Sequence, residues 1–190
     1  MLLTVLRFCG AKKLTSNATF LLIQQHLVDG KLVERDVARL NASKARHLYV
    51  TPAIANLIDG ADPMLGFPSA EATVITDRYL AGWLMVTSLT ARTDPPRARP
   101  DLERLENVDE AWVMCFRKPR PGWRLFGRFA EPSKFVALHA HDRDALAGGA
   151  YEAKAEEMIS TWKAMFEEEE PHRGASVEDY VGGVWRDVSE

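Results

Sequence analysis

The sequence predicts an α+β fold in which a mainly antiparallel sheet is covered by helices. Residues 111–143 contain three short runs of strand-forming side chains separated by two turns, which is typical of consecutive antiparallel strands. Residues 150–166 instead repeat apolar side chains at helical spacing, and such a helix needs a sheet or another helix to cover it. We therefore expect a sheet built from residues 72–141, covered on one face by the helix 150–166 and by the N-terminal helices.

The N-terminal third, residues 1–70, is expected to be mainly helical. Ser16 or Asn17 can cap one helix, and Thr51-Pro52 is a helix start in which threonine caps and proline takes the first helical position. Glycines follow two of the apolar stretches, where a left-handed residue can end a helix. The expected elements are a strand over 2–8 and helices over 16–29, 33–47 and 51–60.

The composition changes to β-branched and aromatic residues after residue 70. Strands are predicted over 73–76 and 83–90, joined by a hairpin turn near Asp77-Arg78. Residues 92–100 are rich in proline and arginine, so they are expected to form an extended surface connection. The three following strands are predicted over 112–117, 123–129 and 135–141, with a turn at 119–122 between the first two.

The chain is expected to form a single domain over residues 1–190. Its parts are a mainly helical region at 1–70, the sheet with its packing helix at 71–166, and an acidic C-terminal extension at 167–190. Ser176 with Asp179 forms a capping box for a last short helix.

Charge and cysteine content limit the classes of protein. The formal net charge of −3 excludes a globally basic protein, so any nucleic-acid contact has to come from a local patch. Cys9 and Cys115 are too few and too far apart to suggest a disulfide framework, which favours a reducing compartment. The start of the sequence does not match a signal peptide, and no apolar run reaches the roughly 18–20 residues that cross a bilayer. We expect a cytoplasmic protein with no membrane contact.

A strip of positive charge is predicted on the middle strand and in the turn before it. Arg124 and Arg128 share one face of the strand, because residues an even number apart point the same way. The side chains on the opposite face are Trp123, Leu125 and Phe129, and the turn adds the cations Arg117, Lys118 and Arg120. A basic strip interleaved with aromatic residues is typical of surfaces that contact RNA or DNA, although ordinary solvated faces share it.

Residues 100–166 resemble the latter part of RelE/ParE-type toxins, HigB-like relatives in particular. The resemblance rests on the order of elements and on the runs PDLERLENVDEAWVMCF, GWRLFGRF and FVALHAHDR. In that family short basic sheets bind messenger RNA, and dispersed side chains cut it by general acid–base chemistry and charge stabilisation. The resemblance implies phosphate contacts at Arg124 and Arg128, and acid–base or oxyanion-stabilising roles at His139, His141 or Arg143. The chain departs from the family in being longer, mildly acidic and without the two lysines after the third strand.

The pair His139 and His141 allows two further interpretations. Both imidazoles share one strand face, so they can bind one metal ion in a metal-dependent hydrolase. However, Arg143 stands where the His-x-His-x-Asp-His signature of metallo-β-lactamase-type hydrolases needs aspartate, so no metal is assigned. The pair can instead be acid–base groups in an open site beside the strand arginines, which would lower their pKa, or structural residues that face the helix 150–166.

A protein–protein interaction module is the competing hypothesis for function. The acidic run 167–170 and Trp185 suggest a C-terminal region that docks a protein partner. No glycine-rich phosphate loop or nucleophile triad is present, so the sequence indicates no cofactor.

Overall fold

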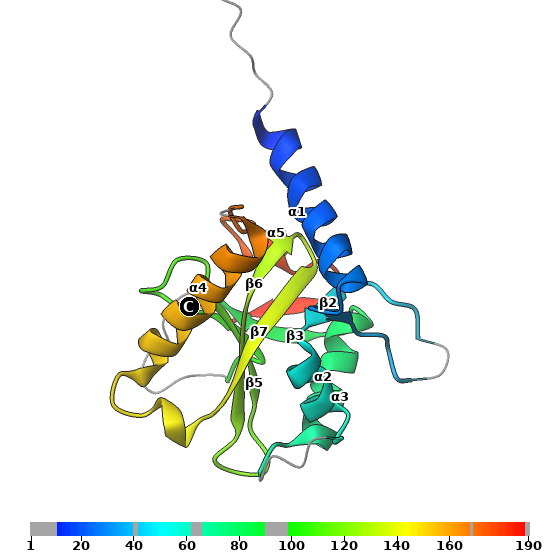
Figure 1. The fold of residues 1–190 in the computed structure, drawn as a ribbon. Helices are drawn as coiled ribbons and strands as arrows, with labels where there is room; N and C mark the ends of the chain where they lie inside the picture. The colour runs from blue at the N-terminus through cyan, green and yellow to red at the C-terminus, as the bar shows by residue number, and fades with distance from the viewer. Residues whose placement is uncertain (1–10, 40–41, 62–65, 90–98, 168, 189–190) are drawn as a thin grey trace, which may run out of the picture.

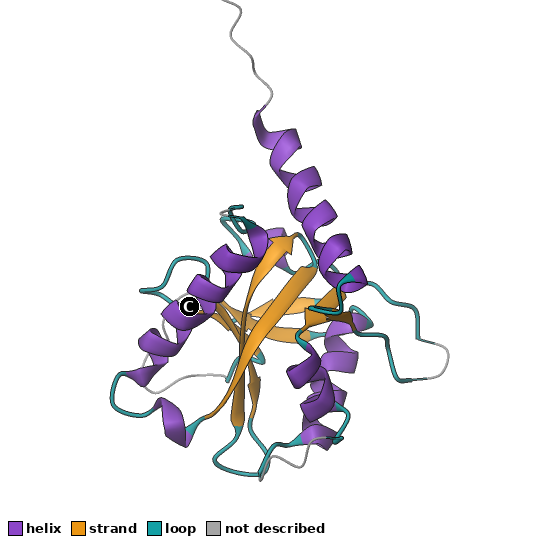
Figure 2. Cartoon of the chain, viewed as in Figure 1, coloured by secondary structure: helices purple, strands orange, loops and turns teal. Residues whose placement is uncertain are grey.

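The computed structural model describes residues 11–39, 42–61, 66–89, 99–167 and 169–188. The elements within these ranges are drawn in Figures 1 and 2. In chain order they are α1 (Ala11–Val28), β1 (Val33–Glu34), β2 (His47–Val50), α2 (Pro52–Ile58), α3 (Ser69–Leu80), β3 (Met85–Ser88), β4 (Leu102–Arg104), β5 (Trp112–Phe116), β6 (Trp123–Glu131), β7 (Lys134–Asp142), the 3₁₀ helix η1 (Asp144–Leu146), α4 (Ala150–Phe166), α5 (Val177–Tyr180) and β8 (Trp185–Asp187).

All of these strands belong to one mixed sheet, in the order β1-β2-β7-β6-β5-β4-β3-β8. The central strands β4 to β7 pair antiparallel, as do β1 and β2. The pairs β2–β7, β3–β4 and β3–β8 are parallel. The α+β class and the mainly antiparallel sheet are therefore confirmed. The sheet also extends beyond the predicted 72–141, because β1, β2 and β8 join its two ends.

Helices cover both faces of the sheet rather than one. α2 and α3 pack on one face, and α4 with the C-terminal half of α1 packs on the other (Figure 1). This is why every residue of β5, and every residue of β6 except Glu131, is buried. None of the described helices is long and apolar enough to cross a membrane.

Several predicted elements are confirmed. The Thr51 side chain accepts a hydrogen bond from the Ile54 N–H and caps α2. Strands β5, β6 and β7 follow the predicted order, with Leu125 and Phe129 on the face opposite Arg124. α4 begins directly after Gly149 and buries Ala155, Met158, Trp162 and Phe166 of the predicted apolar face.

Two predicted elements are wrong, and a mainly helical N-terminal third is not supported by the described residues. The expected helix over 33–47 is replaced by β1, a connection and the start of β2, because Val33 pairs with Val50 at the sheet edge. The expected strand at 73–76 and the turn at Asp77-Arg78 lie within α3. The expected strand 2–8 and most of the connection 92–100 lie outside the described residues.

The C-terminal segment is part of the packed fold. Val177, Tyr180 and Val181 are buried in the core between the sheet and α2 and α3. β8 pairs with β3, and Trp185 is partly buried against the same core. The aromatic residue expected to dock a partner therefore contributes to the packing of this chain.

Candidate functional site at the end of strands β5, β6 and β7

The two strand arginines are buried beneath α4. Arg124 is 6% exposed and Arg128 is 3% exposed. Both lie on the sheet face that carries the apolar cluster against α4, so the face expected to meet nucleic acid is covered by protein. With α4 in place, neither guanidinium presents a surface for phosphate.

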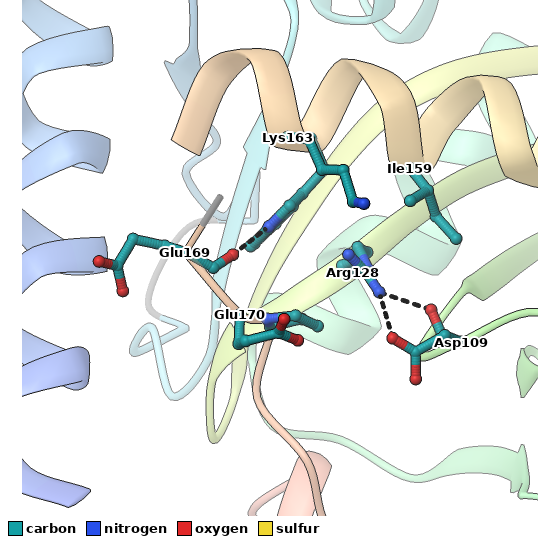
Figure 3. Close-up of a pocket in the computed structure, with 8 residues that line it drawn as sticks. Asp109, Arg128, Ile159, Lys163, Glu169 and Glu170 are labelled. Atoms are coloured by element: carbon teal, nitrogen blue, oxygen red, sulfur yellow. Dashed lines mark hydrogen bonds and ion pairs between the residues drawn. The ribbon is translucent and has the colours of Figure 1, made fainter. Parts of the chain in front are cut away.

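Arg128 is held by neighbours at the C-terminal end of α4 (Figure 3). Its Nη2 donates to the backbone oxygen of Asp109 at 2.6 Å and to the Asp109 carboxylate at 3.2 Å. The guanidinium carbon lies 5.7 Å from the centre of the Trp162 ring. Burial lowers the pKa of Arg128, and Asp109 opposes this shift.

A row of polar side chains crosses three strands at the other end of α4. Cys115, Arg124 and His141 are register partners on β5, β6 and β7, so their side chains share the face toward α4. We call Cys115, Arg124, His141 and Tyr151 the polar row, because Tyr151 from the first turn of α4 closes over it. Nη1 of Arg124 donates to the carbonyl oxygens of Phe116 and Trp123, at 3.2 and 2.9 Å.

The polar row carries three coupled groups. The Cys115 thiol donates to the Glu103 carboxylate at 3.6 Å. Burial by itself lowers the pKa of Arg124, but Cys115, Tyr151 and Glu103 together leave it raised. Burial raises the pKa of Tyr151, so its hydroxyl stays protonated at neutral pH. The row thus combines a fixed cation, a neutral hydroxyl and a thiol in a mostly dry setting.

His139 and His141 lie on the same sheet face as Arg124 and Arg128, and α4 covers that face. A position beside the arginines and a position facing the helix were expected as alternatives, but the structure shows both at once. Nε2 of His139 lies 2.9 Å from the Thr161 hydroxyl on α4. Nε2 of His141 is buried without a hydrogen-bond partner among the described residues. Burial lowers the pKa of both imidazoles, and Lys154 adds to this. Burial is the main cause of the lowered pKa values, and the strand arginines expected to lower them do not contribute.

The stability of the fold should fall as the pH drops below about 6.5, the usual pKa of histidine. Above that pH, His139 and His141 are neutral in both the folded and the unfolded chain. Below it the unfolded chain binds protons that the folded chain resists, because the folded pKa values are lowered. The loss is at most about 1.4 kcal/mol per pH unit and histidine.

Urea unfolding between pH 7.5 and 5.5 measures this loss, since carboxylates titrate mostly below that window. The double variant His139→Gln plus His141→Gln should flatten the dependence, with the three other histidines left as internal controls. An unchanged pH slope in the double variant would show that the pair does not carry the effect.

The exposed cations of the prediction gather at the end of the sheet. Lys118 and Arg120 lie exposed in the loop between β5 and β6, and Arg143 lies exposed just after β7. The Arg143 N–H donates to the carbonyl oxygen of Gly122 at 2.9 Å, which joins the two segments. We call Lys118, Arg120 and Arg143 the basic end.

The loop that carries the basic end is anchored at its base. The Glu71 carboxylate on α3 accepts hydrogen bonds at 2.6 Å from the backbone N–H groups of Arg117 and Lys118. Arg117 itself is half-buried: its guanidinium lies 3.6 Å from Asp101 and donates to the Pro100 carbonyl oxygen. Arg117 therefore forms a structural ion pair with Asp101 and does not belong to the basic end.

A pocket of about 370 Å³ connects the basic end to the polar row. Arg143 and Tyr151 line it together with Asp144, Leu146 and Ala147. Tyr151 belongs to both features, because it lines the pocket and its hydroxyl lies close enough to Arg124 for the two groups to influence each other's pKa. Across the parts of the chain that the structure describes, no cluster of three or more His, Cys, Asp or Glu side chains can hold a metal ion.

Sequence reasoning placed Arg124 and the histidines on one face but missed Cys115, Glu103 and Tyr151 as their neighbours. A four-residue turn at 119–122 would set Lys118 opposite Trp123. In the structure residues 117–122 form the loop and Phe116 pairs with Trp123, which puts Cys115 opposite Arg124.

No protein-family model, curated protein or solved structure matches this chain. The interpretation of the site therefore depends on its own residues. The basic end offers exposed charge, and the polar row offers a buried cation beside a hydroxyl and a thiol.

Proposed function

We propose that this protein contacts single-stranded RNA through the basic end, as a nucleic-acid-contacting accessory protein that resembles a toxin-type ribonuclease. The observation that carries the proposal is the convergence of Lys118, Arg120 and Arg143 on one end of the sheet, beside the Tyr151 pocket. Exposed cations that gather at one place on a mildly acidic protein attract polyanions locally.

The form of the pocket supports a ligand at this end. Its volume of about 370 Å³ falls at the lower end of the roughly 300–1,000 Å³ typical of ligand pockets. Arg143 at the pocket wall can pair with a phosphate that the loop cations draw in, and the Tyr151 ring offers a flat apolar wall to a base. The neighbouring Asp144 disfavours a second phosphate inside the pocket.

The proposal is one of binding rather than cleavage. Nε2 of His141 is buried, so it has no route to a ribose hydroxyl while α4 covers it. Arg124 and Arg128 are likewise buried and have no phosphate contact in this proposal. The implied acid–base roles of His139 and His141 would require α4 to move.

Fluorescence anisotropy with a labelled single-stranded RNA tests the proposal. The triple variant Lys118→Gln, Arg120→Gln and Arg143→Gln should bind at least tenfold more weakly at low salt. The slope of log K against log salt should fall by about 2, since each single-strand phosphate contact contributes about 0.7. His139→Gln plus His141→Gln should bind as the unmodified protein does.

A matched triple variant controls for net charge. Lys31→Gln, Lys154→Gln and Arg186→Gln remove the same number of cations from α4 and from other parts of the surface. Equal losses in both triples, or no retention of RNA at low salt, would contradict the proposal. If duplex DNA binds as tightly as single-stranded RNA, the basic end is an unselective polyanion site.

A further inference from the structure

The pocket beside the basic end is lined by two side chains of opposite charge that have no partner within the described fold. Arg143 and Asp144 both border this pocket of about 370 Å³. Among the residues that the structure describes, neither the Arg143 guanidinium nor the Asp144 carboxylate forms a hydrogen bond or an ion pair. Both groups are therefore available to a ligand, and each attracts a different kind of ligand atom.

The main chain holds Asp144 in place at the pocket. Its N–H donates to the Asp142 carboxylate at 2.7 Å. The Leu146 N–H donates to the Arg143 carbonyl oxygen at 3.1 Å, which closes the turn around Asp144. Leu146 is 5% exposed and packs into the apolar cluster beneath α4, so the turn is anchored to the core. The Asp144 side chain thus starts from a fixed backbone position, which reduces the entropy lost when a ligand binds.

Tyr151 gives the pocket an aromatic side chain that is held by a neighbouring ring. The centroids of the Tyr151 and Phe126 rings lie 5.3 Å apart, and the rings are tilted by 52°. Phe126 itself is fully buried on β6. Burial raises the pKa of Tyr151, so its side chain stays neutral at pH 7. A fixed neutral ring can stack on any base, because every base has a π face, and so stacking alone does not select a base.

The Asp144 carboxylate is the group that can select among bases. An ionised carboxylate only accepts hydrogen bonds. Guanine carries two adjacent donors on its Watson–Crick edge, N1–H and the N2 amino group, so one carboxylate can accept from both. Adenine, cytosine and uracil each place an acceptor beside their donor on that edge, and a carboxylate repels this acceptor. A pocket that contains Asp144 therefore matches guanine better than the other three bases.

We propose that this pocket selects guanine within the single-stranded RNA of the proposed function, on which this inference rests. Asp144 accepts hydrogen bonds from N1–H and the N2 amino group, the Tyr151 ring stacks on the base, and Arg143 pairs with an adjacent phosphate. The volume of about 370 Å³ corresponds to about twelve water molecules at roughly 30 Å³ each, which suits one purine nucleotide and leaves no room for a second one.

Fluorescence anisotropy with a short labelled oligouridine tests the selection on the full chain. The central nucleotide is guanosine, inosine, adenosine or uridine, and nothing else changes. The guanosine RNA should bind about tenfold more tightly than the adenosine and uridine RNAs, because one bidentate pair discriminates by about that factor. Inosine lacks only the N2 amino group, so its RNA should bind with an affinity between those of the guanosine and adenosine RNAs. Equal binding of the guanosine and adenosine RNAs would overturn the guanine assignment.

Substitution of Asp144 locates the selection. The side chain in Asp144→Asn presents one acceptor and one donor group, so the preference for guanosine over adenosine should fall below about twofold, while circular dichroism shows an intact fold. Glu156→Gln is the matched control, because Glu156 is exposed on α4 and does not line the pocket. It removes the same charge and should keep the preference. A preference that survives in Asp144→Asn, or that Glu156→Gln also removes, would contradict the role of Asp144.

The same RNAs separate a failure of this inference from a failure of the proposed function. If all of them bind equally, and the triple variant of the basic end weakens the binding of each, RNA binding stands and the guanine assignment is wrong. If none of them binds at low salt, the proposed function is contradicted, and the guanine assignment is overturned with it.

Discussion

Replacing Arg46 with alanine is expected to lower the free energy of unfolding by about 3 to 5 kcal/mol. Arg46 is fully buried, yet its hydrogen bonds run to carbonyl oxygens instead of a carboxylate. Nε donates to Gly182 at 2.5 Å and Nη2 donates to Val184 at 3.1 Å. Nη1 donates to Tyr79 and Trp83, at 3.3 and 3.2 Å. Alanine would leave these carbonyl groups without their donor, and the cavity would add to the loss.

Urea unfolding followed by tryptophan fluorescence measures the effect of Arg46→Ala. Arg35→Ala is the matched control, because Arg35 pairs with the half-exposed Asp59 at the surface, where ion pairs contribute about 1 kcal/mol or less. If the two variants lose similar stability, the buried network around Arg46 does not hold the C-terminal segment as argued.

The Arg46 network changes how the competing interaction hypothesis should be tested. Truncation after Phe166 would remove Gly182 and Val184, two of the carbonyl partners of Arg46, together with buried Tyr180. Such a truncation would destabilise the whole fold. Loss of a protein partner in that variant would therefore not locate a docking surface in the C-terminal segment.

Local signals in the sequence were sufficient for the β5–β6–β7 meander and for α4. Alternation around Arg124 and Arg128 gave the two faces of β6, and the apolar spacing from Ala155 to Phe166 gave the buried face of the helix. These patterns are local, and each repeats several times within one element. They do not show which element covers which face, and so the burial of the two arginines could not be read from them.

Tertiary packing overrode strand propensity in α3. Thr73 and Thr76 favour strands, but in the structure their hydroxyls donate to carbonyl oxygens one turn earlier, at 2.9 and 2.8 Å. Ala72, Ile75 and Tyr79 then share one buried helix face against the sheet. A short window centred on residues 73–76 contains mainly β-branched residues. The helical spacing of the buried residues can be recognised only over the whole segment 69–80.

The register between β6 and β7 also could not be predicted from the sequence. Phe126 pairs with His139 but Gly127 pairs with Ala137, so Leu138 is an extra residue on β7. Leu138 shares the α4 side with Val136, and the bulge then keeps His139 and His141 on that side as well. Without the bulge, the alternation that buries Val136 would turn both histidines to the other face.

Gly127→Ala is expected to destabilise the protein by about 3 kcal/mol, because the bulge leaves no space for a Cβ atom. A Cβ at Gly127 would collide with the backbone oxygen of Val136 and would lie 2.7 Å from Phe135 Cζ and 2.9 Å from Ala137 Cα. Two of these contacts are backbone atoms of β7, so relief requires the central strands to separate. This separation would displace β7, the strand that carries His139.

Gly30→Ala separates crowding from backbone preference in this test. Gly30 has a φ of +68° and open space around its Cα, so alanine there should cost only about 1 kcal/mol from backbone strain. Urea midpoints compare the two variants, and the NMR titration of the histidine ring protons reports whether the pair keeps its lowered pKa values. Equal midpoints would mean that β7 yields readily at the bulge, and the bulge would then not be what holds the histidines beneath α4.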